Sequence, residues 1–248
     1  MTARAPRVDY GIDAPGVIRN LALVGLTALI AGVLSLYFGA SNLLWGLRFA
    51  FFSIAVFFII ESLLMIAYAK FGKFRHRDRI LAAAGLRGNE RVLDLGTGRG
   101  LLAVGAAKRL REGRVVAVDI WKSEDLSGNS RERTEAVIKA EGVADRVEIR
   151  EADATKLPFG DESFDVVLSN LCIHNISSPE GRRQAIEEAA RVLKPGGRAV
   201  ISDFKNTATY ANHFRDAGLE SIERRGPFLW DTFPPLRIVV AQKGLIAA

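Results

Sequence analysis

The feature that most constrains this fold is a glycine-rich turn between a short apolar strand and a helix-like segment. Residues 91–95 read as a buried strand containing Asp94, and Gly96, Gly98 and Gly100 follow at alternate positions before a helical pattern over residues 101–110. Glycine reaches positive φ and lets a ligand approach the backbone closely. A helix that starts after such a turn points its free N–H groups back at it. The pattern therefore predicts a loop that holds a nucleotide-like ligand.

The spacing of the glycines narrows the choice of ligand. The dinucleotide fingerprint G-x-G-x-x-G requires a third glycine at position 101, where this chain has Leu101. A hydride-transferring oxidoreductase is therefore disfavoured. The pattern present, D-x-G-x-G-x-G, resembles motif I of the class I S-adenosylmethionine-dependent methyltransferases.

Four further segments support this resemblance at the expected distances. Asp119 ends a second strand-like run, residues 114–119, where an acid can accept both ribose hydroxyls. Asp153 follows a third run, residues 146–150, at the place where the family binds the adenine amino group. The other two matches are a fourth strand ending near Asn170 and the turn at residues 191–198. Together the matches cover roughly residues 88–204, about half of the chain.

The resemblance implies S-adenosylmethionine as the cofactor and a set of residues that bind it. We expect Trp121 to stack on the adenine. The expected binding residues are Asp94, Gly96, Thr97, Gly98, Gly100, Asp119, Ile120, Trp121, Asp153, Ala154 and Asn170.

Strand and helix patterns alternate after residue 90, which indicates an α/β fold with a mostly parallel sheet and helices on both faces. The family resemblance implies a Rossmann-like sheet of seven strands, with the last one antiparallel. We expect strands at residues 91–95, 114–119, 146–150, 164–169, 198–203, 219–225 and 236–242, and helices at 75–85, 101–110, 130–141, 179–193 and 207–217.

Two long apolar segments precede the α/β region. Residues 20–47 contain no charge before the Arg at 48, and Glu61 is the one charged residue between 49 and 69. About 20 apolar residues cross a bilayer as a helix, so residues 17–39 and 43–69 predict a transmembrane hairpin. We expect three parts: a tail at 1–16, the hairpin at 17–70 and a methyltransferase domain at 71–248. A cleaved signal peptide fits less well, and a hairpin lying in one leaflet or packed on a partner stays open.

Gly25, Gly32, Gly39 and Gly46 recur every seven residues in the hairpin. Such small-residue stripes favour close helix contact inside membranes, so they suggest a homo-oligomer formed through the hairpin.

Charge is concentrated beside the apolar segments. Residues 1–80 hold nine Lys or Arg and four Asp or Glu, net +5, whereas the remainder holds 25 and 24, net +1. The catalytic region therefore lacks the basic excess of a nucleic-acid binder. The basic residues follow the second span (70, 73, 75, 77 and 79) and precede the first (4, 7 and 19). The positive-inside rule thus predicts an integral protein of the cell membrane with both termini and the catalytic domain in the cytoplasm.

Residues near the transferred methyl should follow the fourth strand, at 170–175. His174 is a candidate general base because imidazole titrates near neutral pH, and a structural role as a helix cap is the alternative. Asp203 ends the fifth strand and could bind the acceptor or orient a side chain. Tyr210 and His213 share a helix face and could line an acceptor pocket, or pack. The single cysteine, Cys172, excludes an intramolecular disulfide and a cysteine-cluster zinc site, and we expect no metal.

Two connecting segments have alternative interpretations. Residues 121–130 could form a lid over the cofactor with Gly128 as a hinge, or a solvated loop. Residues 224–235 combine Arg with aromatic residues, which fits either a membrane-facing surface or packing against residues 75–85.

The sequence as a whole predicts a membrane-anchored methyltransferase whose partners are the lipid bilayer and a lipophilic acceptor, such as a lipid, a quinone or another isoprenoid. Two alternatives stay open: a membrane-anchored protein methyltransferase, and a non-catalytic cofactor-binding module used for assembly.

Overall fold

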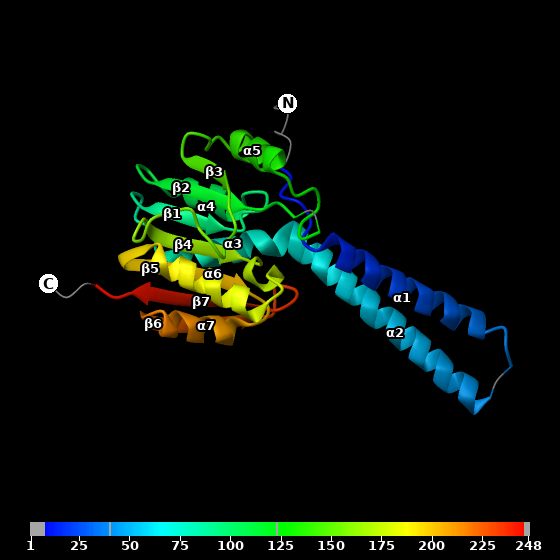
Figure 1. Cartoon of the computed structure of the whole chain (residues 1–248). Helices are drawn as coiled ribbons and strands as arrows, with labels where there is room; N and C mark the ends of the chain where they lie inside the picture. The colour runs from blue at the N-terminus through cyan, green and yellow to red at the C-terminus, as the bar shows by residue number, and fades with distance from the viewer. Residues whose placement is uncertain (1–7, 40, 123, 246–248) are drawn as a thin grey trace, which may run out of the picture.

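The computed structural model describes residues 8–39, 41–122 and 124–245. It consists of an α/β domain and a two-helix hairpin that projects from one side of that domain (Figure 1). Arg4 and Arg7 of the expected basic flank, and Ser123 of the expected lid, lie outside the described residues.

The hairpin consists of α1 (Pro15–Ser35) and α2 (Asn42–Ala67). Pro15 is the first residue of α1, where the backbone N–H that proline lacks would have no partner within the helix. The Ser41 side chain caps α2 by accepting a hydrogen bond from the Leu44 N–H. At the far end, Arg48 is buried and donates to the carbonyl oxygens of Ser35, Phe38 and Gly39. These bonds satisfy one carbonyl at the end of α1 and two in the turn that follows it.

The two hairpin helices pack through part of the glycine stripe. A Cβ added to Gly25 would lie 2.8 Å from Ile59 Cγ1, and one added to Gly32 would lie 3.3 Å from the Phe52 ring. These two glycines therefore serve the contact inside the hairpin. Gly39 and Gly46 have nothing within 4 Å.

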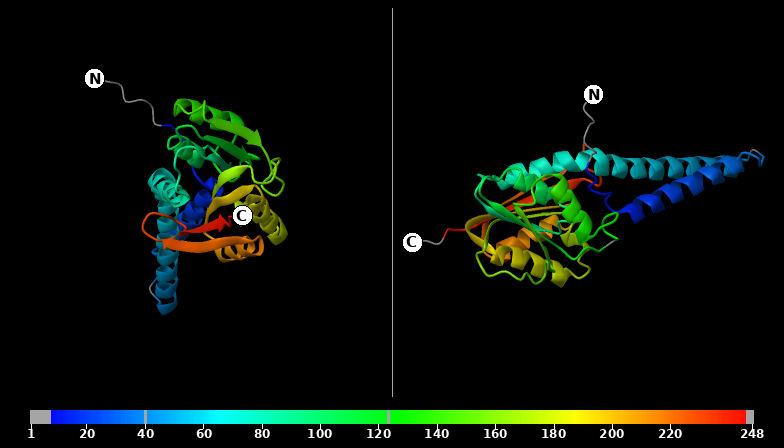
Figure 2. Two further views of the ribbon diagram at one scale, coloured as in Figure 1. Left: turned by 90° about the vertical axis from the view of Figure 1, so that its left-hand side faces the viewer. Right: turned by 90° about the horizontal axis from the view of Figure 1, so that it is seen from above.

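The second helix does not end where the hairpin meets the domain. It passes through a π-helical turn, η1 (Tyr68–Gly72), into α3 (Lys73–Ala84), so that one helical rod of 43 residues runs from Asn42 to Ala84. The boundary expected between residues 70 and 71 falls inside this rod. The hairpin and the domain are thus joined by continuous helix (Figure 2).

The sheet has seven strands in the order β3-β2-β1-β4-β5-β7-β6, and β7 runs antiparallel to both of its neighbours. This arrangement confirms the predicted fold class. The strands are β1 (Arg91–Leu95), β2 (Arg114–Asp119), β3 (Val147–Glu151), β4 (Phe164–Asn170), β5 (Leu193–Asp203), β6 (Leu219–Phe228) and β7 (Leu236–Lys243).

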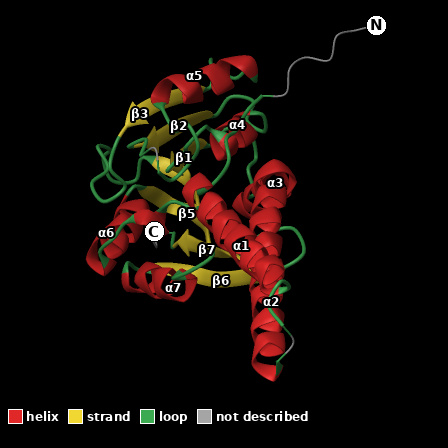
Figure 3. Cartoon of the chain, turned by 90° about the vertical axis from the view of Figure 1, so that its right-hand side faces the viewer, coloured by secondary structure: helices red, strands yellow, loops and turns green. Residues whose placement is uncertain are grey.

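Helices cover both faces of the sheet because successive strand residues point to opposite faces. Val92 packs with α3, α4 (Leu101–Ala107) and α5 (Arg131–Ala140), whereas Leu93 and Leu95 pack with α6 (Pro179–Arg191) and α7 (Thr207–Asp216). Figure 3 shows these two layers. The carboxyl ends of the parallel strands meet at the edge where a doubly wound sheet binds its ligand.

Candidate cofactor site

The glycine turn between β1 and α4 has the conformation that the sequence predicts. Gly96, Gly98 and Gly100 all have positive φ, at 69°, 53° and 80°. The N–H groups of Gly96 and Thr97 donate to Val118 O at 2.9 and 3.0 Å, which fixes the turn on β2. A Cβ on Gly96 would lie 2.2 Å from Cys172 Sγ. Only glycine fits there, because Cys172 closes the space that a side chain would need.

Asp94 is a buried carboxylate at the base of the turn. Its Oδ2 accepts hydrogen bonds from Thr97 Oγ1 at 2.7 Å and from the Ala103 N–H at 3.0 Å. Its Oδ1 is buried and has no partner among the described residues. Burial raises the pKa of Asp94 from 3.8 to about 7, against the lowering effect of its hydrogen bonds. Asp94 lines the cavity, and its unpartnered carboxylate oxygen suits a ligand group that donates hydrogen bonds, above all an ammonium.

Asp119 is the last residue of β2, and its carboxylate bonds the backbone of the same glycine turn. Its Oδ2 accepts from the Gly98 N–H and its Oδ1 from the Trp121 N–H, both at 2.7 Å. Burial is the larger effect and raises the pKa of Asp119, although these two bonds favour the charged form. A carboxylate has about four acceptor positions, so Asp119 keeps capacity for the hydroxyls of a ribose.

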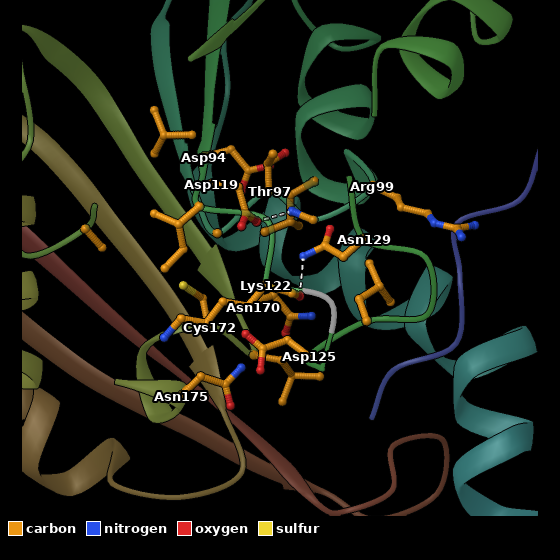
Figure 4. A pocket seen from close by; sticks show the side chains of 18 of the residues that line it. Asp94, Thr97, Arg99, Asp119, Lys122, Asp125, Asn129, Asn170, Cys172 and Asn175 are labelled. Atoms are coloured by element: carbon orange, nitrogen blue, oxygen red, sulfur yellow. Dashed lines mark hydrogen bonds between the residues drawn. The ribbon is translucent and has the colours of Figure 1, made fainter. Parts of the chain in front are cut away.

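Most of the expected binding residues line one cavity (Figure 4). Trp121 is not among them. Its φ is 47° and its indole Nε1 donates to Thr134 Oγ1 at 3.1 Å, so the ring belongs to the contact with α5, and the neighbouring Ile120 lines the cavity instead. Gly100 shapes the turn and faces Thr134 and Ile138. The expected residues that line the cavity are Asp94, Gly96, Thr97, Gly98, Asp119, Ile120, Asp153, Ala154 and Asn170.

Residues 8–14, here called the N-terminal strap, also bound this cavity, which the sequence interpretation of a free tail missed. Tyr10 and Asp13 line the cavity together with Lys73, the first residue of α3. The Lys73 ammonium is buried and donates to Tyr10 O at 3.1 Å and Gly11 O at 2.5 Å. Burial lowers the pKa of Lys73, while Asp13, 3.7 Å from Nζ, opposes that effect.

The strap is bound to the connection at residues 122–129. Ile12 N–H donates to Ser127 Oγ at 2.8 Å, Ser127 N–H donates to Ile12 O at 3.0 Å, and Ala14 N–H donates to Asp125 O at 3.1 Å. Lys122, Asp125, Leu126 and Asn129 line the cavity. The described part of this connection therefore lies against the cofactor site, and its movement as a lid stays a prediction.

Arg99 joins the glycine turn to both segments. This side chain is 4% exposed, and its Nη1 donates to the Asp9 carboxylate at 2.6 Å while its Nη2 donates to Ser127 O at 2.5 Å. Sequence reasoning had no signal for the strap, because these contacts join residues about 30 and 90 positions apart without any local periodicity.

The two candidate catalytic residues lie together, just behind the cavity wall. His174, in the 3₁₀ turn η2 (Ile173–Asn175), places Nδ1 2.9 Å from Asp203 Oδ1, without the alignment of a good hydrogen bond. Asp203 is fully buried and accepts from the His174 N–H, the Phe204 N–H and the Tyr210 hydroxyl. Neither His174 nor Asp203 lines the cavity, whereas Asn170, Cys172 and Asn175 do. Their catalytic roles stay predictions.

The remaining expectations concern residues away from the cavity wall. Tyr210 is fully buried in the core, and His213 lies beside Asp216 on α7, so neither lines the cavity. Burial raises the pKa of the Cys172 thiol, which keeps it neutral. Within residues 8–39, 41–122 and 124–245, no three His, Cys, Asp or Glu side chains gather as a metal site.

A family model described as a methyltransferase domain matches residues 93–201, which include the glycine turn, Asp119, Asp153 and Asn170. This part of the chain is a class I S-adenosylmethionine-dependent methyltransferase domain. The ligand fits the residues present: the unpartnered Oδ1 of Asp94 suits its ammonium group, and Asp119 suits its ribose.

Known proteins resemble the same region. A demethylmenaquinone methyltransferase of Clavibacter sepedonicus is 42% identical over 115 residues, 46% of this chain and 41% of that protein. A 27-O-demethylrifamycin SV methyltransferase of Amycolatopsis mediterranei is 37% identical over 130 residues, 52% of this chain and 44% of that protein. The chain spans about half, or less, of the length of the curated relatives it matches.

A solved structure supports the fold. A SAM-dependent methyltransferase of Aquifex aeolicus aligns with a TM-score of 0.54 at 22% identity, covering 67% of this chain and 88% of that one.

Proposed function

We propose that this protein is a membrane-anchored methyltransferase that transfers the methyl group of S-adenosylmethionine to a lipophilic acceptor. The observation that carries the proposal is the position of the cavity at the base of the hairpin. Asp13 lies two residues before the first residue of α1, and Lys73 directly follows η1 at the end of the hairpin's second helix; both line the cavity. An acceptor in the membrane around the hairpin would therefore be close to the cofactor.

The hairpin has the physical character of a membrane anchor. Both helices are long and apolar enough to cross a bilayer, and few of their residues are buried against the protein. At 1.5 Å per residue, α1 and α2 are about 32 and 39 Å long, against a hydrocarbon core of about 30 Å. Large side chains such as Leu26, Val56 and Phe57 are about half exposed. Contact with lipid would remove this apolar surface from water.

The charge distribution supports a cytoplasmic catalytic domain. Arg19, Lys70 and Arg75 lie near the domain end of the hairpin, whereas the far end carries Arg48, whose guanidinium is occupied by three carbonyl groups. Lys73 is turned into the cavity wall and Arg79 is paired with Asp231, so these two basic residues are less available to a membrane surface than the sequence suggests. The remaining asymmetry still favours the domain on the positive side.

The main task of the chain in methyl transfer is to position the methyl donor and the acceptor. When bound, S-adenosylmethionine supplies an already activated methyl group for in-line displacement. The glycine turn, Asp94 and Asp119 would hold the donor, while Asn170 and Asn175 line the wall after β4, where the family places the acceptor. A base is required only when the acceptor must lose a proton, and His174, with Asp203 beside it, is the candidate that the sequence predicts.

Anchoring favours acceptors that share the membrane. A tether raises the effective concentration of partners held on the same surface and does nothing comparable for soluble ones. Two relatives are named for demethylmenaquinone and 27-O-demethylrifamycin SV. Their names are consistent with a lipophilic acceptor here.

The test is to give native membranes containing the protein a radiolabelled methyl donor and to separate lipid, protein and soluble fractions. We expect label in the lipid fraction, and none when Asp119→Ala replaces the native chain. Label confined to membrane proteins would establish the protein methyltransferase instead. Cofactor binding without transfer to any fraction would identify a non-catalytic module.

A further inference from the structure

The connection between β6 and β7 exposes apolar side chains that the methyltransferase fold does not need. Trp230 is 100% exposed and the adjacent Leu229 is 64% exposed. Buried Trp and Leu side chains normally stabilise a fold through the area they remove from water. Leu229 and Trp230 instead face outward from the domain and do not contribute to its core. Exposed apolar side chains of this kind indicate a contact with a partner or a membrane.

The connection is held firmly despite this exposure. Asp231 accepts two hydrogen bonds from the Arg79 guanidinium, at 2.7 and 2.6 Å, and the Arg79 group also lies over the Phe228 ring at 4.8 Å. Thr232 is buried and accepts from the Leu236 N–H at 3.0 Å. The residues on either side of Leu229–Trp230 are therefore anchored to α3 and β7, and the two apolar side chains project from a fixed base.

This connection lies beside the end of the hairpin. A Cβ on Gly72, the last residue of η1, would meet Asp231 O, so the two backbones touch there. Phe233 lines an apolar groove on α2 together with Ile60, Glu61 and Leu64. Figures 1 and 2 both show the turn between β6 and β7 on the side from which the hairpin leaves the domain. The apolar surface of the hairpin thus continues onto the catalytic domain.

Basic and aromatic residues surround the same place. Phe71 is 61% exposed, and Lys70 and Arg75 are exposed on the same helical rod. Tryptophan with neighbouring Lys and Arg is the composition of the membrane–water interface, where aromatic rings sit at headgroup level and cations contact anionic lipid.

We propose that Leu229 and Trp230 insert into the headgroup region of the bilayer and form, with Phe71, a second membrane contact that sets the tilt of the catalytic domain. This inference rests on the proposed function, because the hairpin must first bring the domain to a bilayer. A hairpin alone leaves open how far the whole body, hairpin and domain together, tilts and rotates in the bilayer. A second contact would keep the cavity facing the membrane.

The three tryptophans of the chain allow a direct test. Trp45 lies near the far end of the hairpin, Trp230 on the proposed contact, and Trp121 inside the domain, where it bonds Thr134. The variants Trp45→Phe, Trp230→Phe and the double variant all retain native Trp121. Each is reconstituted into vesicles whose lipids carry bromine either near the headgroup or near the bilayer centre, and the full-length chain is used throughout.

The emission of Trp230 is the difference between Trp45→Phe and the double variant, and that of Trp45 is the difference between Trp230→Phe and the double variant. We expect Trp230 to lose emission to headgroup-proximal bromine to an extent comparable with Trp45, to lose less to deep bromine, and to be shielded from soluble acrylamide. Trp121 should respond to neither bromolipid. Cofactor binding equal to that of the parent chain verifies that each variant is folded.

Quenching of Trp45 by bromolipid, combined with quenching of Trp230 by acrylamide alone, would overturn this inference and leave the hairpin anchor intact. If neither tryptophan responds to bromolipid, the anchor itself is contradicted, and with it the proposed function.

Discussion

The buried carboxyl group of Asp94 lowers the stability of the fold at neutral pH, and its unpartnered oxygen can accept a hydrogen bond from a ligand. It is 1% exposed, and its pKa rises from 3.8 to about 7 in the fold, chiefly because burial penalises the charged form. Between about pH 4 and pH 7 the unfolded chain has released this proton while the folded chain retains it. Stability contributed by Asp94 is therefore present at low pH and is lost as pH rises through this window.

The matching prediction compares the native chain with Asp94→Asn without cofactor. Asn removes the titration, so the fall in unfolding free energy between pH 4 and 7 should be shallower in the variant. Asp13, Asp119 and Asp125, whose pKa values burial also raises, titrate in both proteins, so the prediction concerns the difference between the two slopes. Denaturant unfolding across this pH range provides the measurement, and identical slopes would show that the pKa of Asp94 is the same in the folded and the unfolded chain.

His174 is the other residue whose role can be decided by substitution. If it removes a proton from the acceptor, His174→Ala should lower turnover about 100-fold while cofactor affinity stays unchanged. Tyr210→Phe is the matched control, because it removes a different bond to the same Asp203 carboxylate. If both variants instead have a lower melting temperature and the same turnover as the native chain, His174 has a structural role beside Asp203 and is not the base.

Single residues were predictable where the chemistry is local. Asp94, Asp119 and Asp153 lie within two residues of the ends of β1, β2 and β3, and all three line the cavity. Trp121 shows the limit: its position two residues after Asp119 suggested stacking on adenine, but its indole bonds Thr134 of α5 and the residue does not line the cavity. A tertiary contact of this kind leaves no signal in the sequence.

At the scale of elements, the strap and the connection at 122–129 are the parts that sequence patterns could not place. Strands and helices follow from alternation and periodicity, and six of the seven strands lie within three residues of their predicted bounds, whereas β5 begins five residues earlier than predicted, at Leu193. Residues 8–14 have no such periodicity, and their order comes from contacts with Arg99, Lys73 and Ser127. The boundary between the hairpin and the domain was also mispredicted. The basic residues at 70–79 suggest the end of the second span, but the helix continues through them to Ala84.

The strap gives a prediction with an internal control. Arg99→Gln should weaken cofactor affinity at least about 10-fold, since it removes charge-assisted bonds from a buried guanidinium that holds two walls of the cavity. Asp9→Asn alters the same ion pair from its exposed side, where the Asp9 side chain is 75% exposed, and should have little effect. Calorimetry measures both, and equal affinities would remove the strap from the cofactor site.

At the scale of the whole molecule, the continuous helix from Asn42 to Ala84 makes the hairpin and the cofactor cavity parts of one body. Leu26 and Val56 lie near the middle of α1 and α2, and both are about half exposed on the outer faces. In water, an Asp at each position would be harmless. At the centre of a membrane helix each Asp costs about 2.5–3.5 kcal/mol.

The most direct measurement therefore uses the double variant Leu26→Asp/Val56→Asp, with Leu26→Ala/Val56→Ala as control, and follows radiolabelled methyl into the lipid fraction. We predict that the Ala control stays in carbonate-washed membranes and labels lipid. The Asp variant should be extracted, should keep its cofactor affinity because the cavity is unaltered, and should lose lipid labelling. Equal lipid labelling by both variants, or equal extraction of both by carbonate, would contradict a membrane-anchored methyltransferase.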